Sequence, residues 1–409
     1  MNAVAADLRR DAALIGLVSS AHLSSHFFQI SLSPLFPLLK DDFGVSYTAL
    51  GAMMTLFYGT SGLAQAFVGI LVDRFGGRRM MVIGLAMLST AMGLTGLAPQ
   101  FWMLFPLLFI AGVGNCVFHP ADLAILSAKI GKGRLGRAFS VHSFCGYIGY
   151  SISPVVIGAM TLLWGWRAAL LTAGCLGLAV VAVLIRFGDR LETGAAAPAA
   201  SGRPAHADQR INFASLAASP AIVAGFFFFA LSSTVSVGLQ TSGVPAIMAV
   251  YDVPLALATG VLTAYLVGSM GGILIGGVLV DRTDRHDLMA IVCVLAAAAM
   301  MVAIASAMAT YSGVVALAAL AGAGMGMVQP ARDVLVRGAS PPGAAGRVFG
   351  LVYSGLDLGS SMTPIVIGWL LDHGEPNIVF VVFAAAQVLT VATVIQVRRH
   401  AIARATPAA

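Results

Sequence analysis

The strongest constraint in this chain is a series of long apolar runs separated by short polar segments. A helix needs about 20 predominantly apolar residues to cross the hydrocarbon core of a bilayer. Only 10% of the 409 residues are charged, whereas soluble domains carry about 25%. The runs predict an all-α polytopic membrane protein with twelve transmembrane helices, at 12–39, 47–72, 79–98, 101–128, 135–163, 166–187, 219–249, 254–280, 287–308, 311–337, 346–371 and 376–397.

The segment 188–218 divides these helices into two sets of six. It is rich in alanine, proline, glycine and charged residues, a composition typical of a flexible linker, and no part of it is apolar enough to span a bilayer. We therefore expect an N-terminal six-helix bundle at 1–187, a linker at 188–218 and a C-terminal six-helix bundle at 219–409.

The basic residues of the loops predict the orientation of the chain. Of the 23 lysines and arginines, only Lys40 and Arg167 fall on one side of the predicted helices, which leaves 21 on the other. Cytoplasmic loops carry an excess of Lys and Arg. Both termini and the linker are therefore expected in the cytoplasm.

The two halves of the chain repeat one another. GILVDRFGGRR around Asp73 returns as GVLVDRTDRHD around Asp281, 208 positions later. AGVGNCVFHPAD around Pro120 returns as AGAGMGMVQPAR around Pro330, 210 positions later. Six predicted spans separate corresponding points, so both copies run through the membrane in the same direction. Such parallel repeats predict a substrate-binding site at their interface. They also predict transport by a rocking motion that opens this site to one side of the membrane at a time.

These motifs resemble a known family. Gly69–Arg79 is similar to the signature loop between the second and third helices of the major facilitator superfamily. VFHP at 117–120, followed by RLGRAFSVHSFCGYIGYSISP, resembles the fosmidomycin-resistance branch of drug exporters, although the acidic residue here, Asp122, comes one position later. The resemblance covers essentially the whole chain. It implies the major facilitator fold, located in the cell (inner) membrane.

The signature loops suit a cytoplasmic gate. An aspartate can bind the N-terminus of a neighbouring helix, where unpaired N–H groups and the helix dipole favour an anion. The resemblance implies that Asp73 meets the eleventh helix and Asp281 the fifth. The alternative is that these loops only set topology. The candidate gating residues are Asp73, Arg74, Arg78, Arg137, Asp281, Arg282 and Arg347.

Ionisable residues at membrane depth are costly and are candidates for function. His22 and His26 lie one turn apart in the first helix, which in the superfamily lines the central cavity with the fourth, seventh and tenth. Two alternatives stay open: the histidines equally suit packing between helices, and Asp122 can pair with Arg137 or His142. The candidate substrate and proton pathway residues are His22, His26, His119, Asp122, His142, Gln329, Arg332 and Asp357.

The motifs that are missing from the sequence exclude several functions. The four cysteines lie scattered in apolar runs without metal-ligand spacing, so we expect neither a metal nor a cofactor. No nucleotide motif suggests ATP-driven pumping, and basic residues confined to loops do not suggest nucleic acid. The expected partners are a small-molecule substrate, protons and the lipid bilayer, with the chain as a monomer.

Together these features predict a secondary active transporter and no enzyme. The resemblance to drug exporters favours proton-coupled export of a small organic solute or drug, by antiport. Two alternatives remain: proton symport for uptake of a small organic anion, and an intramembrane enzyme using His119 with Asp122, which lacks a nucleophile motif.

The charge bias makes a prediction about topology. A fluorescent protein fused after Ala409 should fluoresce, since it folds in the cytoplasm, whereas alkaline phosphatase fused there should be inactive. High phosphatase activity would show that the number of membrane spans is odd.

Overall fold

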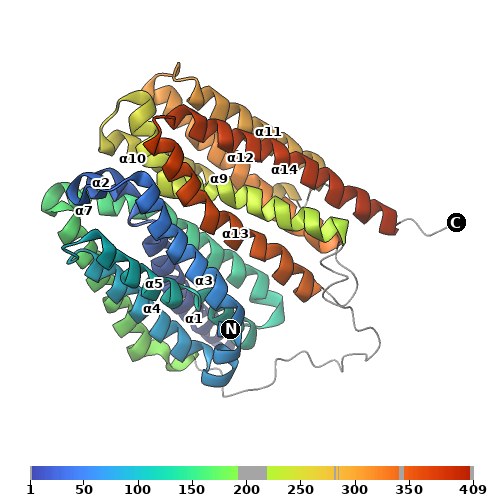
Figure 1. Cartoon of the computed structure of the whole chain (residues 1–409). Helices are drawn as coiled ribbons and strands as arrows, with labels where there is room; N and C mark the ends of the chain where they lie inside the picture. The colour runs from blue at the N-terminus through green and yellow to red at the C-terminus, as the bar shows by residue number, and fades with distance from the viewer. Residues whose placement is uncertain (1, 192–218, 281, 284, 340–344, 406–409) are drawn as a thin grey trace. The chain divides into compact units, whose positions relative to one another are not determined.

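The computed structural model describes residues 2–191, 219–280, 282, 283, 285–339 and 345–405. Among these residues the regular elements are all helices, without a strand (Figure 1). Within this described part, seven helices are long and apolar enough to cross a membrane. The all-α membrane architecture expected from the apolar runs is therefore confirmed. Most of the expected linker, 192–218, and Asp281 lie outside the described residues.

Among the described residues, the first half of the chain holds seven α-helices and three short 3-10 helices. They are α1 (Asn2–Gln29), η1 (Ser33–Leu35), α2 (Phe36–Phe43), α3 (Tyr47–Phe75), α4 (Gly77–Thr95), η2 (Phe101–Met103), α5 (Leu104–Asn115), α6 (Phe118–Lys129), α7 (Lys132–Phe187) and η3 (Gly188–Leu191).

The second half holds six long helices, and the proline-containing ones among them continue through their prolines. They are α9 (Pro220–Tyr251), α10 (Leu255–Val280), α11 (His286–Ala305), α12 (Tyr311–Ala339), α13 (Ala345–Asp372) and α14 (Pro376–Ala405). Pro245, Pro330 and Pro364 lie inside α9, α12 and α13.

Prolines explain one error and one interruption in the predicted spans, since 101–128 still matches a single candidate membrane span, Phe101–Leu126. The span 12–39 is wrong at its C-terminal end, because α1 ends at Gln29 and the chain turns before α2. Pro34 and Pro37 lie in the first turns of η1 and α2, where the backbone N–H groups have no partner within the helix and a missing N–H therefore costs no hydrogen bond. The span 101–128 is divided into α5 and α6, because Pro120 has no N–H to donate to the carbonyl of Cys116.

A glycine divides the longest helix into two. The helix α7 contains Gly165 with a φ of 80°, a conformation open to glycine and strained for other residues. The segments before and after Gly165 correspond to the two spans predicted at 135–163 and 166–187. One continuous element in the chain therefore serves as two membrane helices.

The chain divides into two compact units. One comprises Met1–Val45 and Leu56–His206, and the other comprises Ser46–Thr55 and Ala207–Ala409. The first residues of α3 thus group with the second unit. The division into bundles at 1–187 and 219–409 stays a prediction.

Helix pairing inside the two halves follows the sequence repeat. In the first half α1 packs on α7 and α4 packs on α5 and α7. In the second half α9 packs on α13, and α11 packs on α12 and α14. The corresponding helices therefore pair in the same way, which is the packing expected of two parallel repeats.

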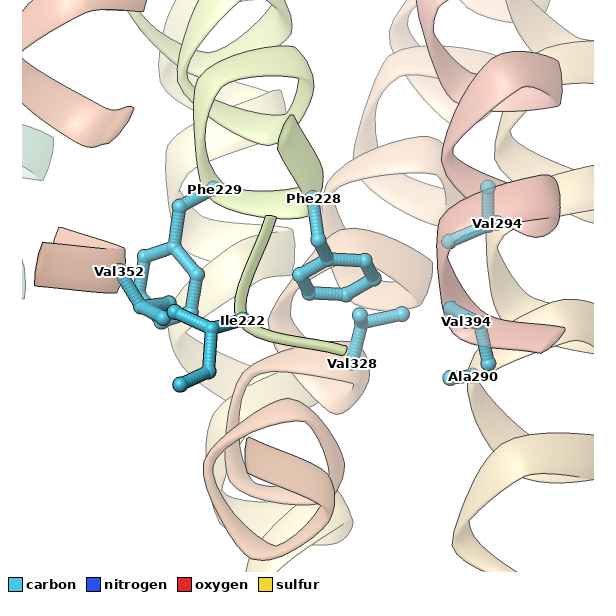
Figure 2. Close-up of a cluster of buried hydrophobic side chains, with 8 residues drawn as sticks. All are labelled: Ile222, Phe228, Phe229, Ala290, Val294, Val328, Val352 and Val394. Carbon is cyan, nitrogen blue, oxygen red and sulfur yellow. The ribbon is translucent and has the colours of Figure 1, made fainter. Parts of the chain in front are cut away.

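An apolar cluster joins five helices of the second unit. Figure 2 shows its members: Ile222, Phe228 and Phe229 from α9, Ala290 and Val294 from α11, Val328 from α12, Val352 from α13 and Val394 from α14. Inside a bilayer, close van der Waals fit holds helices together, because lipid tails are as apolar as the side chains. This half of the molecule is therefore built around an apolar core.

Candidate functional site

The helix α1 presents three polar side chains on one face. His22, His26 and Gln29 follow one another at intervals of four and three residues, the spacing of neighbours on a helix surface. All three are buried within the first unit. The face of α1 that carries them is therefore turned into the protein, where each polar group requires a partner.

Two other helices bring ionisable side chains to this face. Asp122, on α6, is fully buried. Its Oδ2 lies 3.1 Å from Nδ1 of His22 and 3.4 Å from Nε2 of His142, a buried side chain on α7. The rings of His22 and His142 stack with centroids 3.9 Å apart. Three helices separated in sequence thus converge on one carboxylate.

The contacts of Asp122 do not have the geometry of hydrogen bonds. Neither carboxylate oxygen of Asp122, nor Nδ1 of His22, has a hydrogen-bond partner among the described residues. Leaving a buried donor or acceptor unpaired costs about 1–3 kcal/mol, and more for a charged group. Such groups in a native structure point to a role in function. Asp122 is therefore the strongest functional candidate in the first unit.

His119 forms the exposed edge of this group. It lies one turn before Asp122 on α6, and its ring centroid is 5.5 Å from that of His22 and 6.2 Å from that of His26. Its side chain is exposed, unlike those of the four buried members. We call His22, His26, His119, Asp122 and His142 the histidine–aspartate cluster. All five were candidates from the sequence, and the structure brings them together.

A hydrogen-bonded network continues from the cluster along α1. The ring of His26 stacks on Tyr150 at 4.2 Å, and the Tyr150 hydroxyl donates to Oε1 of Gln29 at 2.7 Å. Gln29 donates to Oδ1 of Asn115 at 3.3 Å, and Asn115 donates to Ser61 at 2.9 Å. We call Gln29, Ser61, Asn115 and Tyr150 the polar network.

Sequence reasoning missed Gln29 and Tyr150. Gln29 had a readable signal, because it shares the helix face of His22 and His26. Tyr150 had none, since an aromatic residue in an apolar run reads as a packing residue. Its hydroxyl matters only because α7 packs directly on α1.

Two glycines of α7 allow this close packing. A Cβ at Gly146 would lie 2.7 Å from Nε2 of His22 and 2.9 Å from Cε1 of His26. A Cβ at Gly149 would lie 2.3 Å from the carbonyl oxygen of Leu23. Real Cβ atoms essentially never approach other atoms below 3.0 Å. Glycine at 146 therefore leaves room for the rings of His22 and His26, and glycine at 149 leaves room for the backbone of α1.

The pathway candidates of the second half lie on α12 and α13. The guanidinium of Arg332 lies over the ring of Phe229 at 3.9 Å, a cation–π contact. Gln329 lies one turn before it on α12, partly buried. Asp357, near the middle of α13, is partly buried and makes no hydrogen bond or ion pair with the described residues.

The candidate gating residues are described only in part. Arg78 pairs with Asp189 at 2.8 Å and donates to the carbonyl of Ile185 at 3.0 Å, which ties the start of α4 to the end of α7. Arg74 and Arg282 are exposed. Asp281 and the side chains of Asp73, Arg137 and Arg347 lie outside the described residues. Of the two partners expected for Asp122, His142 is thus seen beside it.

Comparison with known proteins identifies the family. The family model of the Major Facilitator Superfamily matches residues 18–258 and 226–409. The chain belongs to this superfamily. The structure of the nucleoside transporter NupG (D323A mutant) is similar, with a TM-score of 0.75 over 94% of this chain and 99% of that one, at 13% identity. At this identity the likeness shows the fold alone.

Two curated relatives from Escherichia coli K12 match part of the chain, and one of them agrees with the expected branch. The fosmidomycin resistance protein is 26% identical over 176 residues, which cover 42% of this chain and 43% of the relative. The probable L-galactonate transporter is 27% identical over 162 residues, covering 40% and 36%. The chain therefore matches well under half the length of either relative.

Membership in the superfamily places the chain among integral membrane proteins, in agreement with its long apolar helices. The resemblance to the fosmidomycin-resistance branch read from the sequence is confirmed by the match to that protein.

The glycine contacts predict the effect of a single methyl group. Gly146→Ala should lower the free energy of unfolding by about 1–3 kcal/mol, since the new Cβ collides with His22 and His26. Gly158→Ala, on the same helix, is the matched control, because nothing lies within 4 Å of its Cβ position. Thermal unfolding in detergent measures both. Equal unfolding temperatures for the two variants would show that α1 and α7 do not pack as described.

Proposed function

We propose that this protein is a secondary transporter that exports a small organic solute or drug from the cytoplasm in exchange for protons. It resides in the inner membrane with both termini in the cytoplasm, as the 21-to-2 distribution of basic residues suggests. The observation that carries the proposal is the buried histidine–aspartate cluster with its exposed edge at His119. A polar site inside a membrane-embedded unit serves a solute that must leave water during transport.

The proposed pathway uses residues of both halves. Those of the first half are His22, His26, His119, Asp122 and His142, and those of the second half are Gln329, Arg332 and Asp357. The cluster and the polar network offer hydrogen-bonding groups side by side, and Arg332 adds a fixed positive charge. These groups suit a solute with hydroxyl, carbonyl or anionic groups better than a purely apolar one.

The relatives support two directions of transport. One is a fosmidomycin resistance protein, whose name favours export of a drug. The other is a probable L-galactonate transporter, whose name fits a small organic anion, and this supports proton symport for uptake as the second candidate function. Fosmidomycin and L-galactonate are therefore the first solutes to test, by stabilisation of the purified protein against heat.

Asp357 is the proposed carrier of the coupling proton. A solute can move uphill without ATP only if an ion moves downhill, and the sequence contains no nucleotide-binding motif. A carboxylate in the middle of a membrane helix is a functional candidate by default. Asp357 stands there without an ion pair among the described residues, so a proton is the simplest partner for its charge.

Proteoliposomes with an imposed pH gradient and no membrane potential test this coupling. An acidic interior should drive uptake of the solute if the exchange is antiport, and Asp357→Asn should abolish that drive while sparing downhill exchange. Asp252→Asn is the control, because Asp252 is exposed at the C-terminal end of α9 in a left-handed conformation that asparagine tolerates.

The other outcomes of this experiment are equally informative. Uptake of the solute driven by an acidic exterior would show that the solute and the proton move in the same direction, which is symport and not antiport. Transport that ignores the gradient would refute proton coupling, and a response unchanged in Asp357→Asn would remove Asp357 from the pathway.

The repeated signature loops predict unequal gating defects. Asp73→Asn should lower the transport rate at normal expression, by weakening a contact between charge and helix dipole worth about 0.3–2 kcal/mol. Asp281→Asn should have a smaller effect, because its copy of the loop has no counterpart of the closing GGRR of GILVDRFGGRR. Initial rates in vesicles measure this difference. Transport rates equal to wild type in both variants would show that these loops set the membrane topology and do not act as a gate.

A further inference from the structure

We propose that His22, Asp122 and His142 form a binding site for a divalent transition-metal ion of the zinc class. Each of the three offers one ligand atom, an imidazole nitrogen from each histidine and a carboxylate oxygen from Asp122. The three atoms all lie within 4.8 Å of one another, and the three side chains are buried. Nothing in the proposed transport cycle requires such an ion, so the site is an additional property of the first unit.

The separations of the ligand atoms fit a tetrahedral ion. With metal–ligand bonds of about 2.0–2.2 Å, two ligands of a tetrahedral zinc ion lie about 3.3–3.6 Å apart. The carboxylate oxygen lies 3.1 Å from one nitrogen and 3.4 Å from the other, and all three ligand atoms lie within 4.8 Å of one another. Side-chain rotations that bring the two imidazoles together would let one ion contact all three groups.

The alternative reading of these distances is a pair of hydrogen bonds, and the geometry disfavours it. Oδ2 of Asp122 and Nδ1 of His22 approach each other without hydrogen-bond geometry, and no described residue donates to either carboxylate oxygen. A cation between the three side chains would accept a lone pair from each of them and leave none of the three ligand atoms without a partner.

The donor set selects the class of metal. Two imidazole nitrogens and one carboxylate oxygen suit Zn²⁺, Co²⁺ or Ni²⁺, whereas Ca²⁺ and Mg²⁺ prefer oxygen ligands alone. Three protein ligands leave a fourth position for water or an anionic group of a solute. The exposed His119 lies beside the ring of His22, at the edge of the cluster through which a hydrated ion can enter.

Metal titration of the whole chain tests the site. The protein is purified in detergent, freed of any affinity tag and stripped of metal, and Zn²⁺ is added in competition with a coloured chelator. We expect one tightly bound ion per chain, and at least tenfold weaker binding in Asp122→Asn and in His142→Gln. His373→Gln is the matched control, since His373 is exposed at the end of α13, and it should bind as wild type does.

A spectroscopic readout keeps the test valid if a variant folds poorly. Co²⁺ bound to the wild-type protein should give the visible absorption of a four-coordinate ion, and X-ray absorption of the Zn²⁺ form should show two imidazole ligands. Substoichiometric binding, a six-coordinate oxygen environment, or affinity unchanged by both ligand substitutions would each overturn the proposal.

Discussion

A carboxyl group buried between two histidines is the constraint on which the chemistry of the first unit depends. The helices α1, α6 and α7 meet at Asp122, since His22 and His142 approach the same oxygen from α1 and α7. Glycine at position 146 leaves room for the rings of His22 and His26. A carboxyl group placed so deeply without hydrogen bonds among the described residues is expensive to keep, and this cost points to a role in function.

The two halves share helix pairings but differ in what those helices enclose. In the first unit, α1 and α7 enclose histidines, a carboxylate and the amide side chain of Gln29. In the second, the corresponding α9 and α13 contribute Phe229 and Val352 to an apolar cluster (Figure 2). Sequence repetition has thus preserved the packing while the chemistry diverged. The first unit offers a group of neighbouring polar side chains, and the second offers the charged groups of Arg332 and Asp357.

The sequence predicted the membrane architecture and the members of the cluster, and it did so for physical reasons. Apolar runs of membrane length have few alternatives to a membrane helix, and ionisable residues inside them are rare enough to single out. The pairing of Asp122 with His142 was one of two alternatives read from the sequence. The approach of His22 to the same carboxylate was not readable, because His22 lies about 100 positions before Asp122, beyond the reach of any local metal-ligand spacing. The interruptions at Pro34 and Pro120 were readable from the prolines and were missed because the hydrophobic run continues through them.

The measurement that tests this account most directly is the thermal stability of Asp122→Asn in the metal-free state. Asparagine keeps the size of the side chain and removes the charge. If the carboxylate serves function rather than folding, the variant should unfold at the temperature of the wild type or above it, since a costly buried charge is gone. A clear fall in the unfolding temperature, with His373→Gln unchanged, would contradict the account and make the cluster a structural support between helices.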